Sequence, residues 1–206
     1  MNFLKIIFSV VVSLAFYTAS GQTFSGKLTY KFSTNDSIFY KDSFLVKLAE
    51  EYGNPNNAIT GVLVKGNRFF SECKSKEHKL LFKLYQNRDT AFLVGGNQKD
   101  KSKYSKNMTA TLKPLSKSED YKYILGFKCK KYLYADINSE QIFTVWIPDN
   151  FGFNKQAKNG KFFSLYFFPD GLAFNIEVAY KGTVSKHELI ILELYDVPDG
   201  DFNIEN

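Results

Sequence analysis

The sequence is poor in the residues on which most enzymes and metal sites depend. Its 206 residues include two cysteines, two histidines and one tryptophan. It contains no G-x-S-x-G elbow, no Walker loop, no G-x-G-x-x-G and no H-E-x-x-H. The adjacent acids Glu50–Glu51 and Glu119–Asp120 would point apart on a helix or strand, so neither pair faces one substrate. The sequence therefore predicts a protein that is not an enzyme and has no cofactor or metal site.

Arginine is equally scarce, because Arg68 and Arg88 are the only two in the chain. The net charge of +6 therefore comes mainly from lysines, which are scattered among Asn and Tyr. Nucleic-acid-binding proteins concentrate Arg and Lys on one face or one helix, so we expect no nucleic-acid partner. Net charge also acts on non-specific association, and attraction to an anionic envelope surface stays open.

The chain lacks an apolar run long enough for a transmembrane anchor, which needs about 18 residues or more. Its longest run, Ile6 to Tyr17, has 12 residues and follows the positive Lys5. The small residues Ala19 and Gly21 precede Gln22. This layout predicts a signal peptide cleaved between Gly21 and Gln22. No cysteine follows the run as in a lipoprotein, so we expect a soluble exported protein, periplasmic or extracellular.

The two cysteines, Cys73 and Cys129, leave two alternatives open. Cysteines of exported proteins pair more often than those of cytosolic proteins, which favours a Cys73–Cys129 disulfide. A bridge requires the two Cβ atoms to lie close together, and a sequence does not show whether they do. The other alternative is two buried free thiols. Neither cysteine has the spacing of a zinc ligand.

Aromatic residues, by contrast, are abundant, with 21 Phe and 13 Tyr. This excess favours a β-rich core. Alternating apolar residues separated by turn signals predict an antiparallel meander in one domain, residues 22–206, with a lysine-rich loop over residues 95–107. The predicted strands cover residues 24–33, 60–64, 68–73, 78–85, 90–95, 109–115, 126–136, 142–148, 161–168, 172–180 and 188–197.

Residues 37–52 depart from this pattern, because their apolar residues recur at helical spacing. Asp36 or Ser37 is the expected N-cap, and Gly53 and Pro55 end the segment. Two short strands are the alternative. The predicted strand 161–168 is apolar on nearly both faces, so both of its sides must be covered. The expected fold class is mainly β (α+β): a curved antiparallel sheet or half-barrel with one amphipathic N-terminal helix.

Several motifs, in this order, resemble small exported envelope proteins of the GLPGLI type and their relatives. Ser25–Tyr30 resembles their opening Gly-x-Ile-x-Tyr strand, and Gly126–Lys131 is similar to their Gly-aromatic-x-Cys-x-Lys strand. Val145–Pro148 resembles their Trp-containing strand, and Pro169–Leu172 stands where GLPGLI would fall, with Asp170 interrupting the match. The resemblance implies the fold of the LolA-like lipoprotein carriers, a curved half-barrel with a helix in its mouth, and no established catalytic residues.

These observations predict an exported, non-enzymatic envelope protein that holds a lipid or acyl chain between sheet and helix. The alternative is a structural or interaction protein of the envelope, with a filled core, an envelope protein partner and no ligand. A roomy apolar cavity would favour the first, and a solid core the second. The residues expected to touch the ligand are Ile38, Leu45, Leu48, Tyr52 and Trp146.

Overall fold

The computed structural model describes residues 25–35, 56–66, 68–87, 90–95, 101–104, 112–151 and 166–202. The predicted signal peptide with its cleavage site at Gly21–Gln22 lies outside these residues. So does the predicted helix 37–52, with Ile38, Leu45, Leu48 and Tyr52. Within the described part of the chain, no helix is long and apolar enough to cross a membrane.

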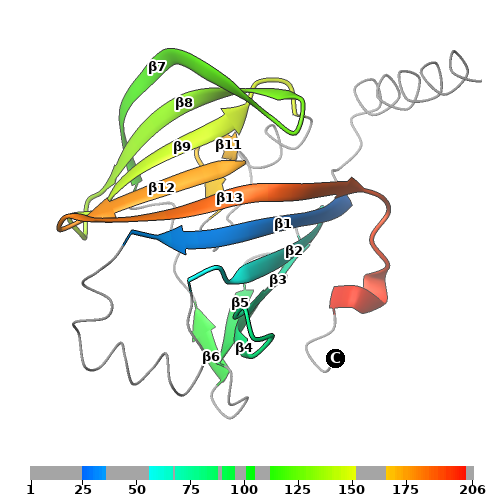
Figure 1. The fold of residues 1–206 in the computed structure, drawn as a ribbon. Coiled ribbons are helices and arrows are strands. Elements are labelled where there is room, and N and C mark those ends of the chain that lie inside the picture. Colours follow the sequence, from blue (N-terminus) through cyan, green and yellow to red (C-terminus); the bar gives the residue numbers. More distant parts are fainter. Residues whose placement is uncertain are drawn as a thin grey trace, which may run out of the picture.

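Eleven strands among the described residues form a single antiparallel sheet, so the predicted curved antiparallel sheet is confirmed (Figure 1). The strands of this sheet are β1 (Ser25–Thr34), β2 (Ile59–Lys65), β3 (Arg68–Lys74), β4 (Leu80–Asn87), β5 (Thr90–Gly95), β6 (Lys101–Tyr104), β7 (Leu112–Ile124), β8 (Phe127–Asp136), β9 (Ile142–Pro148), β12 (Asn175–Tyr180) and β13 (Thr183–Leu194).

The sheet is a meander in which the first and the last strand of the chain pair with each other in the middle of the sheet. Its order is β6-β5-β4-β3-β2-β1-β13-β12-β9-β8-β7, so strands that follow one another in the chain are neighbours in nearly every case. The pair β1–β13 joins the first strand to the last. The consecutive strands β6 and β7 lie at the two opposite edges, and the sheet therefore stays open.

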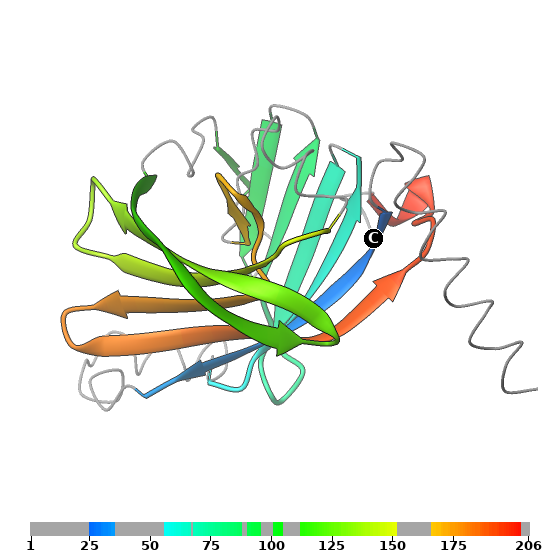
Figure 2. The same ribbon diagram turned by 90° about the horizontal axis from the view of Figure 1, so that it is seen from above.

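A second, two-stranded sheet lies on the concave side of the first, between its two halves (Figure 2). It consists of β10 (Phe167–Phe168) and β11 (Gly171–Leu172). The sequence predicted one strand of the meander over residues 161–168. In the structure its last two residues turn inside the curved sheet, where both of their faces are covered by apolar side chains. The rest of the predicted strand, residues 161–165, lies outside the described part of the chain.

Strand β6 corrects another expectation, because it lies inside the segment predicted as a loop, residues 95–107. Its residues pair with β5 through the backbone, Lys101 opposite Val94 and Tyr104 opposite Ala91. An edge strand needs only one hydrogen-bonded neighbour, and polar residues with lysine are common there. The apolar alternation on which the sequence prediction depended is therefore weakest at such a strand.

Residues 196–202, which follow the last strand, are anchored to the sheet. The Lys65 ammonium lies 2.9 Å from the Asp196 carboxylate and 3.2 Å from that of Asp199. The Val197 amide donates to Ser25 Oγ at 2.8 Å. The short 3-10 helix η2 (Asp199–Phe202) follows and buries Phe202. These contacts tie residues 196–199 to β1 and β2.

Candidate functional site

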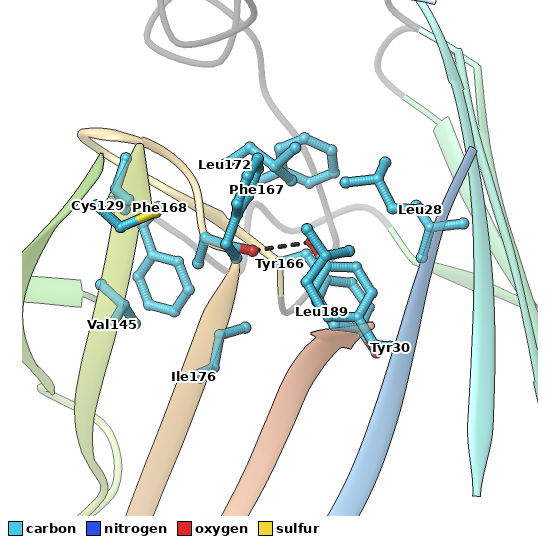
Figure 3. Packing of buried hydrophobic residues seen from close by; sticks show 14 of the residues in the cluster. Leu28, Tyr30, Cys129, Val145, Tyr166, Phe167, Phe168, Leu172, Ile176 and Leu189 are labelled. Carbon is cyan, nitrogen blue, oxygen red and sulfur yellow. Dashed lines mark hydrogen bonds between the residues drawn. The ribbon is translucent and has the colours of Figure 1, made fainter. Parts of the chain in front are cut away.

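The concave side of the sheet is lined by apolar side chains from both of its halves (Figure 3). Alternate residues of a strand point to opposite faces, and on β9 the buried residues Phe143, Val145 and Ile147 alternate with less buried ones. We call the face on which these buried residues lie the inner face. On β2 the alternation buries Val62 and Val64 in the same way. The inner face is therefore mainly apolar from β3 to β8, with the buried hydroxyls of Thr60 and Ser71 among its side chains.

Residues 166–174, which we call the plug segment, lie against this inner face. The Phe167 ring meets the Phe69 ring of β3 at a centroid distance of 5.3 Å. The next ring, that of Phe168, meets Tyr134 of β8 at 5.3 Å and Phe143 of β9 at 5.9 Å. Two consecutive phenylalanines thus contact opposite halves of the sheet. The plug segment bridges the two halves from within.

Hydrogen bonds from side chains and from the backbone fix the plug segment to the sheet. The Tyr30 hydroxyl of β1 donates to the Ala173 carbonyl at 2.8 Å. The Tyr134 hydroxyl donates to the Asp170 carboxylate at the turn of the segment. Strands β10 and β11 pair only with each other. At the end of the segment, the Phe174 amide donates to the Trp146 carbonyl at 2.8 Å, and the Phe174 carbonyl accepts from the Leu189 amide at 2.9 Å.

A small polar cluster is buried where the plug segment begins. The Tyr166 ring stacks on the Tyr30 ring at 4.0 Å, and its hydroxyl lies 3.4 Å from Nδ1 of His187 on β13. Burial raises the pKa of both tyrosines and lowers the pKa of His187 from 6.5 to about 4. At neutral pH all three side chains are uncharged. The cluster therefore fits an apolar interior and carries no charge for a ligand.

Both cysteines are buried, and in the structure both are free thiols. Cys73 lies on β3 and Cys129 on β8, and five strands separate β3 from β8 in the sheet. Burial raises the pKa of Cys73 and raises that of Cys129 to about 12. Only the thiolate is a strong nucleophile, so neither side chain has the character of a catalytic cysteine.

The polar atoms inside the described part of the molecule are satisfied by the protein itself. Among the described residues, every buried side-chain nitrogen and oxygen has a hydrogen-bond partner. The same residues contain no group of three His, Cys, Asp or Glu side chains placed to hold a metal ion. A polar ligand needs partners that a site leaves free for it. Among the described residues, the inner face therefore offers mainly apolar surface to a ligand.

Of the predicted ligand-contacting residues, only Trp146 lies in the described part of the chain. Its side chain points away from the inner face, because its neighbours Val145 and Ile147 point toward it. The indole lies under two ammonium groups, that of Lys122 at 4.5 Å and that of Lys131 at 5.9 Å. Trp146 therefore belongs to a cation–π stack on the outer face of β9.

Sequence reasoning missed the residues that hold the plug segment. In the sequence, Tyr30 is one of several alternating residues of a predicted strand, and His187 belongs to no motif. One signal was available: the run from Phe162 to Phe168 is apolar on both faces, which is unusual for a strand with one solvated side. It pointed to a covered element, but it did not say that the element would lie inside the sheet.

Comparisons with known proteins show similarity at the level of fold. No family model and no curated protein matches the chain, so membership in the GLPGLI-type family is not confirmed. An uncharacterized conserved protein from Thermus thermophilus aligns with a TM-score of 0.50 and 6% identity, over 94% of this chain and 92% of that one. This match indicates a shared fold and carries no function with it.

Two further solved structures are similar over most of their length, with lower scores. A LolA superfamily protein from Nitrosomonas europaea aligns with a TM-score of 0.43 and 11% identity, covering 94% of this chain and 97% of that one. The lipoprotein LppX from Mycobacterium tuberculosis aligns with a TM-score of 0.39 and 12% identity, covering 84% of this chain and 88% of that one.

Proposed function

We propose that the protein is an exported, non-enzymatic envelope protein that binds an apolar ligand, a lipid or acyl chain, on the inner face of its sheet. The observation that carries this proposal is the plug segment. It places two phenylalanine rings, Phe167 and Phe168, on an apolar concave surface that spans both halves of the sheet. An acyl chain could replace these rings with a surface of the same chemistry.

Such a replacement would leave the main sheet intact. Strands β10 and β11 have no ladder of hydrogen bonds to the eleven-stranded sheet. Moving residues 166–172 outward breaks the contacts of their side chains and the hydrogen bond from Tyr134 to Asp170. It leaves the pairing of β9, β12, β13 and β1 untouched. A ligand can therefore enter at the cost of local contacts alone.

The chemistry of the interior sets the class of ligand. The hydroxyls of Tyr30 and Tyr166 already have partners, and His187 is uncharged at neutral pH. An anionic or hydroxylated headgroup would be buried there without compensation, which is unfavourable. The ligand is therefore bound through its hydrocarbon part, and its headgroup stays in solvent.

A second candidate function is an envelope structural or interaction protein with a filled core. The same plug segment favours it, because Phe167 and Phe168 are each only 2% exposed and touch both halves of the sheet. In this case the rings are permanent core residues and the inner face never opens. The two candidates differ in what happens when one ring is removed.

The test uses a fluorescent fatty acid and a matched pair of variants. Phe168→Ala removes a ring from the inner face, and Phe70→Ala removes one from β3 beside Tyr85, on the other face from the buried Phe69. We expect the wild type to bind the probe. Phe168→Ala should bind it about tenfold more tightly, because the space freed admits about two further methylene groups. Phe70→Ala should leave the affinity unchanged.

Native mass spectrometry of the protein purified from its own envelope gives an independent result. An adduct with the mass of a lipid supports the proposal. If no adduct is present, and neither the wild type nor Phe168→Ala binds the probe, the inner face is a closed core. The interaction protein is then the better description.

A further inference from the structure

The end of the β7–β8 hairpin exposes apolar and aromatic side chains together. Tyr121, Tyr123 and Leu125 are 55%, 68% and 48% exposed. They are alternate residues at the end of the hairpin, and the two tyrosine rings meet edge to face at 6.0 Å. Single exposed apolar residues are normal on a protein surface, but three in five residues form a patch.

The turn itself has a backbone that leucine does not favour. Leu125 has a φ of 49° and Gly126 a φ of 84°, both positive, as in a type I′ hairpin turn. Asn, Asp or Gly is the usual residue at the position of Leu125, because a branched apolar side chain is strained there. Leu125 is also half exposed, so burial within the described structure does not offset this strain.

Lysine surrounds the patch on both faces of the hairpin. Residues 121–131 contain four lysines and no acidic residue. Lys131 and Lys130 form ion pairs with Asp120 at 3.6 Å and Asp149 at 3.8 Å. Lys122 is partly buried, with its ammonium over the Trp146 ring at 4.5 Å. Lys128 is exposed, forms no ion pair with the described carboxylates and lies over the Tyr121 ring at 4.2 Å.

Protection of the sheet edge explains only part of this composition. Strand β7 is an edge strand, and lysine on an edge prevents pairing with other chains. An exposed Tyr–x–Tyr–x–Leu sequence at the same edge acts in the opposite direction, because it adds apolar surface to an unpaired strand. The lysines are accounted for by the edge, and the tyrosines and the leucine are not.

We propose that residues 121–128 dock on an anionic lipid surface, with Tyr121, Tyr123 and Leu125 in the interfacial layer and Lys128 against lipid phosphates. Tyrosine is enriched at the boundary of hydrocarbon and water, and leucine enters the hydrocarbon. Lysine near an anionic leaflet contributes electrostatic attraction, which salt screens. The proposal concerns the outer end of one hairpin, so it does not depend on a ligand at the inner face.

The experiment is co-sedimentation of the mature protein with lipid vesicles. One set contains phosphatidylcholine alone and the other phosphatidylcholine with phosphatidylglycerol. We expect binding to the anionic vesicles to exceed binding to the neutral ones by about tenfold or more, and to weaken as sodium chloride is added. Leu125→Asn combined with Tyr123→Ser should reduce the binding to anionic vesicles about tenfold, because both interfacial side chains are lost.

Matched controls separate the hairpin end from general hydrophobicity and charge. Ile137 is 67% exposed at the other end of β8, and Lys76 is exposed between β3 and β4. Ile137→Asn and Lys76→Gln should bind vesicles as the wild type does, while Lys128→Gln should bind less. Asn tolerates a positive φ, so Leu125→Asn is compatible with the fold, and its thermal midpoint checks this.

Three results would overturn the proposal. The first is equal binding to neutral and anionic vesicles, or none to either. The second is a double variant that binds anionic vesicles as tightly as the wild type. The third is a dimer in solution that Leu125→Asn dissociates, because the patch would then be an interface between two copies of this chain.

Discussion

The plug segment and the end of the β7–β8 hairpin use the same residue types in opposite ways. In the plug segment and its surroundings, Tyr30 and Tyr166 are buried, stacked and hydrogen-bonded. At the hairpin end, Tyr121 and Tyr123 are exposed. The first pair is explained completely by folding, because each ring and each hydroxyl has a partner. The second pair is not, and a partner outside the chain is the simplest reason for it.

The comparison teaches where function is to be sought in a chain without catalytic motifs. Inside the sheet, the polar groups are satisfied and the side chains are neutral, so burying a charge or water there is unfavourable. At the hairpin end, a strained leucine, two exposed tyrosines and the exposed Lys128 form a surface that suits an external partner. The inner face and the hairpin end therefore suggest two different contacts with lipid, one with a single molecule and one with a surface.

The comparison is tested most strongly by the same substitution in both regions. Tyr30→Ala removes a fully buried ring, leaves a cavity and leaves the Ala173 carbonyl without its donor. We expect it to lower the free energy of unfolding by about 3–5 kcal/mol. Tyr123→Ala should change it by no more than about 0.5 kcal/mol. Urea unfolding followed by circular dichroism measures both. Similar losses in the two variants would remove the distinction.

The buried His187 near the plug segment should make the free energy of unfolding depend on pH. Its pKa is lowered by burial from 6.5 to about 4, so the unfolded chain binds its proton more readily than the folded one. The contribution of His187 is therefore present in full above pH 6.5 and is lost as the pH falls toward 4. The loss over this range is about 3 kcal/mol, since one pKa unit corresponds to about 1.4 kcal/mol.

The measurement for His187 is the free energy of unfolding between pH 7 and pH 4 in the wild type and two variants. His187→Asn should flatten the dependence, while His187→Gln, which also lacks a titrating ring, should flatten it equally. Identical slopes in the wild type and His187→Asn would mean that His187 is accessible to water. The interior next to Tyr166 would then be less closed than the hydrogen bonding suggests.

Tyr134→Phe tests how firmly the plug segment is held. The variant keeps the ring that packs on Phe168 and removes the hydrogen bond to Asp170. We expect a loss of about 1–2 kcal/mol, because the acceptor is a carboxylate. Tyr132→Phe is the control and should cost less. Amide exchange at Ala173, whose N–H donates to the Tyr166 carbonyl, should accelerate in Tyr134→Phe alone. If exchange is unchanged there, the aromatic contacts hold the segment without the hydroxyl.

Most strands of the sheet could be predicted from the sequence, because apolar and polar residues alternate clearly wherever one face of a strand is buried. Strands such as β2 and β9 lie within one residue of their predicted limits. The pairing of β1 with β13 was not predictable from local pattern, since it joins the two ends of the chain. The plug segment was missed for a related reason. Phe167 and Phe168 look like strand residues, and only their long-range contacts with Phe69 and Tyr134 place them inside the sheet.

One further substitution, Leu125→Asn, is expected to raise the stability of the fold slightly. Leu125→Asn replaces a half-exposed leucine at a φ of 49° with a residue that tolerates this backbone. We expect the free energy of unfolding to rise by up to about 1 kcal/mol, because strain is relieved and little packing is lost. Thermal and urea unfolding measure the change, with Leu115→Asn, a similarly exposed leucine of β7, as the control. A fall of the same size would show that Leu125 packs within the fold. A rise would mean that the chain keeps a leucine there against its own stability, as a docking residue requires.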